Sequence, residues 1–225
     1  VAKLTAASPD LNFKQGTATG DGIVGLYLKG NTDISAYTNT ITVGNTVGTN
    51  SAIGIYSDAQ GVSGTPYVIK ANIATGTKAV GIFSAPDREP VPPATTPTPN
   101  KSYIKYLGSQ MDLGEGSTGF YVNGKTELDT TNKTTTINLN GGLVAYVTED
   151  STFKGGTATI NLTKSGIGVY GEKGAVVEVG TWHFNNNGNA AEEIRSEEGK
   201  ANITATLKNL KPKMVLSHVI NGETS

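Results

Sequence analysis

The sequence predicts an all-β fold: a right-handed single-stranded parallel β-helix, or β-solenoid, with irregular loop insertions. Three observations lead to this prediction. A five-residue strand motif occurs six times, a second short apolar-polar-apolar segment precedes most copies, and Gly, Asn and Asp turns separate the segments. A repeat of this size, with one strongly patterned strand in each unit, is typical of stacked architectures in which each unit buries its apolar face only against its neighbours.

The repeated motif ends in an aromatic residue. Its copies end at residues 27, 56, 83, 121, 146 and 170, so subtraction gives spacings of 29, 27, 38, 25 and 24. The aromatic is Tyr in every copy except Phe83, and the residue two positions earlier is Gly in every copy except Val144. The positions one and three before the aromatic are almost wholly apolar. Because side chains alternate along a strand, we expect these two apolar columns to line the core and the Gly and aromatic columns to lie on the opposite face.

Two further strands complete the expected coil. One precedes the motif in several repeats, at residues 11–13, 41–43, 111–113, 137–139 and 160–162. Another follows the aromatic, at residues 125–129, 151–154 and 175–179. Three short strands in about 24 residues, joined by tight turns, describe a triangular coil of a parallel β-helix. Asn138 and Asn161 should fall in one column, where stacked amides can stabilise the strands.

We expect one domain. Residues 1–182 should form coils with a proline-rich insertion at about 85–109, and residues 183–225 an irregular acidic segment with further or capping coils. Residues 85–100 contain most of the nine prolines and cannot join a ladder. The only helix-like run is at 190–200, which is rich in Glu.

Composition argues against several classes of function. The 18 basic and 19 acidic side chains are spread along the chain and give no electrostatic footprint for nucleic acid. No apolar run is long enough to cross a bilayer, and residues 1–20 lack the basic start and apolar block of a signal peptide. Cysteine is absent, which excludes disulfides and thiolate metal sites. We expect no metal site and no cofactor.

The repeated Ile-Gly-Ile-Tyr and Ile-Gly-Val-Tyr strands, each preceded by an Ile-Asn-Leu type strand and a Gly or Ser turn, resemble the passenger repeats of type V autotransporter adhesins, particularly the large fusobacterial kind. The resemblance covers residues 21–182. It implies a cell-surface passenger fragment of a larger outer-membrane-anchored protein, used for adherence to host cells or other bacteria. The implied partner is a protein or glycan receptor on such a surface, with no nucleic acid and no direct membrane insertion of this fragment. No serine protease motif is present, so protease activity is not implied.

The insertion at 85–109 is the candidate binding site, through Asp87, Arg88, Glu89, Tyr103 and Tyr106. Loops that project from a rigid scaffold often carry binding residues, and proline limits the entropy lost on binding. The alternative is a solvated insertion that the fold tolerates without a role in binding.

The other aromatic residues also have two interpretations. The aromatic column is either a stacked ladder that shields the backbone, which we favour, or a platform for sugar rings. The Trp182, His183 and Phe184 segment is either a contact patch or, as is more common for such clusters, the end of the core.

Carboxylates following the aromatic raise the alternative of a polysaccharide-acting β-helical enzyme or a tailspike-like depolymerase. Asp58, Glu149 and Glu172 occupy similar places in three repeats, and a glycosidase needs two carboxyls about 5 to 9 Å apart. Asn123 and Lys29 hold the equivalent places elsewhere, so we interpret these as turn positions and expect no enzyme activity. A purely structural spacer is a further alternative.

Overall fold

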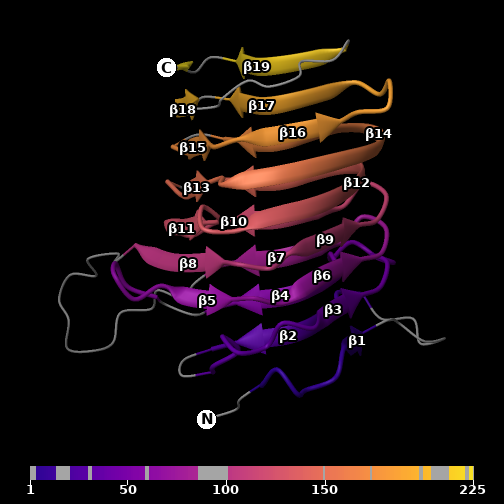
Figure 1. Ribbon diagram of the computed structural model, residues 1–225, viewed down its shortest axis with the longest axis vertical. Coiled ribbons are helices and arrows are strands. Elements are labelled where there is room, and N and C mark those ends of the chain that lie inside the picture. Colours follow the sequence, from indigo (N-terminus) through magenta and orange to yellow (C-terminus); the bar gives the residue numbers. More distant parts are fainter. Residues whose placement is uncertain are drawn as a thin grey trace.

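The computed structural model describes residues 4–13, 21–29, 32–58, 61–85, 101–148, 150–172, 174–197, 200–203, 213–220 and 223–224. These residues form a parallel β-solenoid of about six turns, without helices in the described ranges. The coils advance along one axis from β1 (Leu11–Phe13) and β2 (Val24–Leu28) at one end to β19 (Met214–Ile220) at the other (Figure 1). The predicted fold class is therefore confirmed.

Three columns of strands build the coils. The first column contains, besides β1, the strands β3 (Thr40–Val43), β6 (Asn72–Thr75), β9 (Gln110–Leu113) and β16 (Trp182–Asn185). The second contains, besides β2 and β19, the strands β4 (Ile53–Ser57), β7 (Val80–Ser84), β10 (Thr118–Val122) and β17 (Ala191–Glu197). The long strands β12 (Thr134–Val147) and β14 (Thr157–Gly171) run through both columns and join them into one 13-stranded sheet.

The third column is a separate seven-stranded sheet. It contains β5 (Tyr67–Ile69), β8 (Ser102–Tyr106), β11 (Thr126–Asp129), β13 (Thr152–Lys154), β15 (Val176–Val179), β18 (Lys200–Ile203) and β20 (Glu223–Thr224). All pairings between the named strands are parallel. The strands predicted before and after the motif are thus present at their expected places.

The main core lies between the two sheets and runs along the axis, and a smaller cluster of Val43, Ala52 and Ala79 lies beside it. Equivalent positions of successive coils stack within it, since Ile41, Ile73, Met111, Ile137 and Ile160 follow one another in the ladder register and are all at most 2% exposed. Burying each such side chain contributes roughly 1.5–3 kcal/mol. This burial depends on the neighbouring coil, so a single coil has no core of its own.

Polar ladders on the outside reinforce the same register. Asn185 donates a hydrogen bond from Nδ2 to Oδ1 of Asn161 at 2.8 Å, and Asn161 donates in the same way to Asn138 at 2.8 Å. Asn138 in turn donates to Asp112 Oδ1 at 2.6 Å. The amide column predicted from Asn138 and Asn161 is therefore confirmed; it extends over three coils and ends on the Asp112 carboxylate of a fourth.

Two sequence-based expectations about secondary structure are wrong. The run at 190–200 is not helical but forms β17 and the start of β18, because its residues pair in register with β14 and β15. The insertion is shorter than the predicted 85–109, because Ser102–Tyr106 is strand β8 and pairs with β5 and β11. Pairing with neighbouring coils outweighs local helix propensity at 190–200, whereas at 102–106 the alternating Tyr and Ile residues favour the strand by themselves.

Candidate functional site

The six motif aromatics form one ladder along the solenoid. Successive ring centroids, from Tyr27 through Tyr56, Phe83, Tyr121 and Tyr146 to Tyr170, are 5.2, 5.2, 4.6, 4.8 and 5.4 Å apart. The rings are stacked, with one tilted pair between Tyr121 and Tyr146. Each such pair contributes about 0.5–1.5 kcal/mol beyond the area that it buries. This geometry supports the interpretation of the column as a structural ladder.

The glycine of the motif faces the core, contrary to the expectation that it lies on the outer face with the aromatic. The residue after it also faces inward, as Gly54 and Ile55 show by both being buried. The ladder pairing skips the glycine, and a Cβ atom on Gly54 would lie 2.7 Å from the carbonyl oxygen of Gly81. The close approach of neighbouring backbones therefore favours glycine at residue 54, although Val144 and Glu193 hold the equivalent place in other coils. The irregularity interrupts the alternation of side chains.

This irregularity also corrects the prediction for the residue three positions before the aromatic. That position lies outside the main core cluster and on the side of the strand that carries the ladder, although its exposure varies from 42% at Val24 to 7% at Val80, which is buried. We call these residues the outer aliphatic column. Its members are Val24, Ile53, Val80, Leu143 and Ile167, with Thr118 in the fourth coil.

A groove lies over the first coils, where the outer aliphatic column and the aromatic ladder run side by side. Its volume is about 440 Å³, and its lining residues include Val24, Ile53 and Val80 from the column and Tyr56, Phe83 and Tyr121 from the ladder. Residues of two loops complete the lining: Asp21, Gly22, Thr49, Asn50 and Ser51. A groove that combines an apolar floor with polar groups along one side is typical of binding sites in proteins.

Asp21 anchors the polar side of this groove. Its Oδ1 accepts a hydrogen bond from the backbone N–H of Asn50 at 2.7 Å, and its Oδ2 accepts one from Asn50 Nδ2 at 2.9 Å and one from Thr49 Oγ1 at 3.0 Å. These hydrogen bonds, the backbone one above all, lower the pKa of the Asp21 carboxyl. The group is therefore a carboxylate at neutral pH, and it joins the loop before β2 to the loop before β4.

Of the five predicted binding residues of the insertion, the structure describes two. Asp87, Arg88 and Glu89 lie outside the described residues, and their role stays a prediction. Tyr103 is half-buried in β8, with the Lys101 Nζ atom 5.9 Å from its ring centroid. Tyr106 is fully buried and packs edge-to-face on Phe120 at 5.0 Å, so it is a core residue that offers no surface to a ligand.

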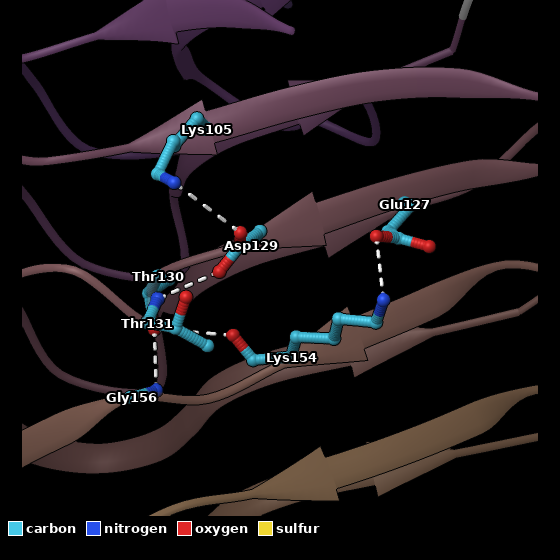
Figure 2. A network of polar contacts seen from close by, with 7 residues as sticks. All are labelled: Lys105, Glu127, Asp129, Thr130, Thr131, Lys154 and Gly156. Atoms are coloured by element: carbon cyan, nitrogen blue, oxygen red, sulfur yellow. Dashed lines mark hydrogen bonds and ion pairs between the residues drawn. The ribbon is translucent and has the colours of Figure 1, made fainter. Parts of the chain in front are cut away.

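A charged network covers the outer face of the seven-stranded sheet (Figure 2). Glu127 pairs with Lys154 at 2.7 Å and with Lys101 at 2.8 Å, while Lys105 pairs with Asp129 at 3.6 Å. Partial burial would raise the pKa of Glu127, but the hydrogen bonds from the two lysines outweigh it and lower the pKa. Opposite charges alternate between coils here, which favours a structural role for this network.

The carboxylates considered for catalysis are engaged in local contacts. Asp58 is buried, accepts a hydrogen bond from the Tyr27 hydroxyl at 3.0 Å and lies 3.5 Å from Lys29 Nζ. Glu172 accepts a hydrogen bond from Thr148 Oγ1 at 3.3 Å. Glu149 lies outside the described residues. These contacts explain the two described acids as parts of turns and coil interfaces.

The cluster at the start of β16 belongs mostly to the core. Trp182 and Phe184 are each 5% exposed and pack on each other and, through Trp182, on Phe153. His183 alternates to the outer side and is half-buried. Trp182 and Phe184 are therefore core residues, as the second interpretation of this cluster predicted.

Comparison of the chain with known protein families, curated protein sequences and solved structures found no match. In the described part of the chain, no helix is long and apolar enough to span a membrane. The same residues contain no group of three or more His, Cys, Asp and Glu side chains placed to hold a metal ion. The candidate site therefore has to be judged on its own geometry.

Sequence reasoning missed the groove. The apolar positions that form its floor were visible in the motif, but simple alternation assigned them to the core. Asp21, Thr49 and Asn50 stand in loops of different length, where no repeat marks them. The signal in the sequence was the glycine two places before five of the six aromatics, since glycine inside a strand often marks an irregularity that redirects the side chains around it.

Proposed function

We propose that this chain is a non-enzymatic segment of a bacterial cell-surface adhesin of the type V autotransporter kind, part of a larger outer-membrane-anchored protein. It would act as a stiff rod that presents a binding surface to a protein or glycan receptor on host cells or other bacteria. The observation that carries the proposal is the aromatic ladder with its adjoining groove, which lies on the outside of the stacked coils.

The arrangement of the coils supports this role. Each interface between coils combines parallel ladder pairing, core packing and stacked outer side chains, which makes a rigid support for exposed loops and grooves. The local contacts of Asp58 and Glu172 favour binding over polysaccharide cleavage, because a glycosidase needs two carboxyls facing one sugar.

The test is binding of the purified chain to a glycan array and to a panel of epithelial and bacterial cells. A second chain would have residues 86–100 replaced by a short Gly-Ser linker, so that β7 and β8 are retained. Saturable binding is the expected result. Loss of binding in the second chain would place the receptor site in the insertion, whereas retained binding would place it on the coils.

Two results would overturn the proposal. The first is cleavage of oligosaccharides by the purified chain, with loss of cleavage in Glu149→Ala. The second is the absence of binding to every surface tested by a chain whose circular dichroism shows the folded β-structure.

A further inference from the structure

We propose that the groove beside the first part of the aromatic ladder binds an apolar side chain of a protein partner, at a segment where that side chain is flanked by Lys or Arg. This inference names the ligand class of the adhesive function proposed above, and it rests on that function. The groove spans several coils, since Val24, Ile53, Val80 and Tyr121 belong to four successive strands of the second column.

The ladder presents ring edges rather than ring faces to the groove. Tyr56 stacks between Tyr27 and Phe83, and Phe83 stacks between Tyr56 and Tyr121, at centroid distances of 4.6–5.2 Å. The faces of both rings are therefore covered by their neighbours. A sugar ring or a nucleobase binds best by stacking on an open aromatic face, so this geometry favours an aliphatic or aromatic side chain that packs against ring edges and branched aliphatic groups.

Much of the polar side of the groove is engaged in internal hydrogen bonds. The Asn50 amide and backbone N–H and the Thr49 hydroxyl donate to Asp21. An oligosaccharide carries many hydroxyls, and it would need donors and acceptors that are not used in this way. The groove therefore suits a ligand whose buried part is apolar.

The negative charge of Asp21 favours a positively charged group beside the apolar side chain of the ligand. Among the described residues that line the groove, Asp21 is the only charged one. Its carboxylate is solvent-exposed, and an ammonium or guanidinium group next to it would make a charge-assisted contact. A carboxylate or sulfate in the same place would be repelled.

The size of the groove is consistent with an anchor of this kind. Its volume of about 440 Å³ lies within the roughly 300–1,000 Å³ of typical ligand pockets. Protein interfaces commonly depend on a few apolar or aromatic anchors that fill such a pocket. One anchor gives weak affinity on its own, and we expect a dissociation constant on the order of 0.1–1 mM for a short peptide.

The experiment is a titration of the ¹⁵N-labelled chain with synthetic peptides, followed by amide chemical shifts. One peptide carries Phe flanked by Lys, and its partner carries the same Phe flanked by Glu. We expect the Lys peptide to shift amides of the groove residues. The Glu peptide should bind about fivefold more weakly at low salt, and this difference should shrink at high salt.

Matched substitutions locate the site. Ile53→Lys puts a charge on the groove floor and should abolish the shifts, whereas Ile167→Lys changes the same motif position outside the groove and should leave them intact. Val24→Lys is a second variant, because Val24 is already 42% exposed and its replacement leaves the core untouched. Equal loss of binding in Ile167→Lys would overturn the inference.

Neutral oligosaccharides form the other arm of the titration. Shifts of the groove amides with oligosaccharides and not with peptides would overturn the inference, as would an absence of shifts with both. If cells bind the wild-type chain while no peptide moves the groove amides, the adhesive function stands and this inference fails. If peptides bind the groove while no cell binds the chain, the adhesive function fails instead.

Discussion

Replacing Glu193 by Gln should stabilise the protein at neutral and alkaline pH. Glu193 lies in β17 opposite Gly168, so it occupies the inward-facing glycine column of the motif. Its side chain is 3% exposed, and burial raises its pKa to about 7 from the ordinary value of 4.5. The folded state is therefore more stable when the Glu193 carboxyl is protonated and uncharged.

The magnitude follows from this shift in pKa. Because the folded pKa is above the unfolded one, the folded state binds more protons between pH 4.5 and 7, and stability falls as the pH rises through this window. A shift from 4.5 to about 7 corresponds to a loss of up to about 3 kcal/mol, at about 1.4 kcal/mol per pH unit. Above pH 7 the loss is complete and constant. Gln cannot ionise, so the Glu193→Gln variant does not lose this stability as the pH rises.

The assay is denaturant unfolding followed by the fluorescence of Trp182, the only tryptophan in the chain, which is buried at the same end of the core. The free energy of unfolding of Glu193→Gln, minus that of the wild type, should grow by about 3 kcal/mol between pH 4.5 and 8. A difference that stays constant over this range would refute the reasoning, because it would mean that Glu193 has the same pKa in both states.

Substitutions at three further positions test the outer contacts by unfolding. Glu127→Gln should cost about 1 kcal/mol at pH 7 and progressively less as the pH falls below the ordinary pKa of Glu, the opposite sign to Glu193, because Lys101 and Lys154 lower the pKa of Glu127 and its contribution is lost as the pH falls through that lowered pKa; a cost that does not change with pH would contradict this. Asn161→Ala should cost about 1–2 kcal/mol, since two amide hydrogen bonds are lost; an unchanged midpoint would show that the ladder adds nothing. Phe83→Ala should cost about 2 kcal/mol and Phe83→Tyr almost nothing, because only the first breaks the stack; similar losses in both would argue against stacking.

Most of the fold could be predicted from the sequence because the repeats are periodic. The spacing of the aromatics set the coil length, and the flanking segments such as 137–139 and 160–162 matched the ladder pairs of β12 and β14. The Asn column was visible for the same reason, since in-register stacking turns a repeated residue into a row. These features depend on one position being copied from coil to coil.

The errors arose where the structure departs from simple alternation or from local propensity. The irregularity at the motif glycine placed Ile53 on the outer face and left Glu193 inside, which a period of two does not predict. Tyr106 follows a proline-rich stretch in sequence, yet its ring completes the core of a neighbouring coil. Asp21 and Asn50 meet only because two loops of unrelated sequence lie side by side.

The aromatic ladder bears on how the protein would respond to mechanical force. The rings and the ladder hydrogen bonds both connect one coil to the next, so a pull along the axis loads all the interfaces in series. The weakest interface yields first, and extension proceeds one coil at a time. A coil of 24 residues, as between Tyr146 and Tyr170, releases roughly 80 Å of extended chain in place of about 5 Å of folded rod. Under tension the solenoid would therefore lengthen in large steps and absorb a pull, while the coils that have not yet opened keep their structure.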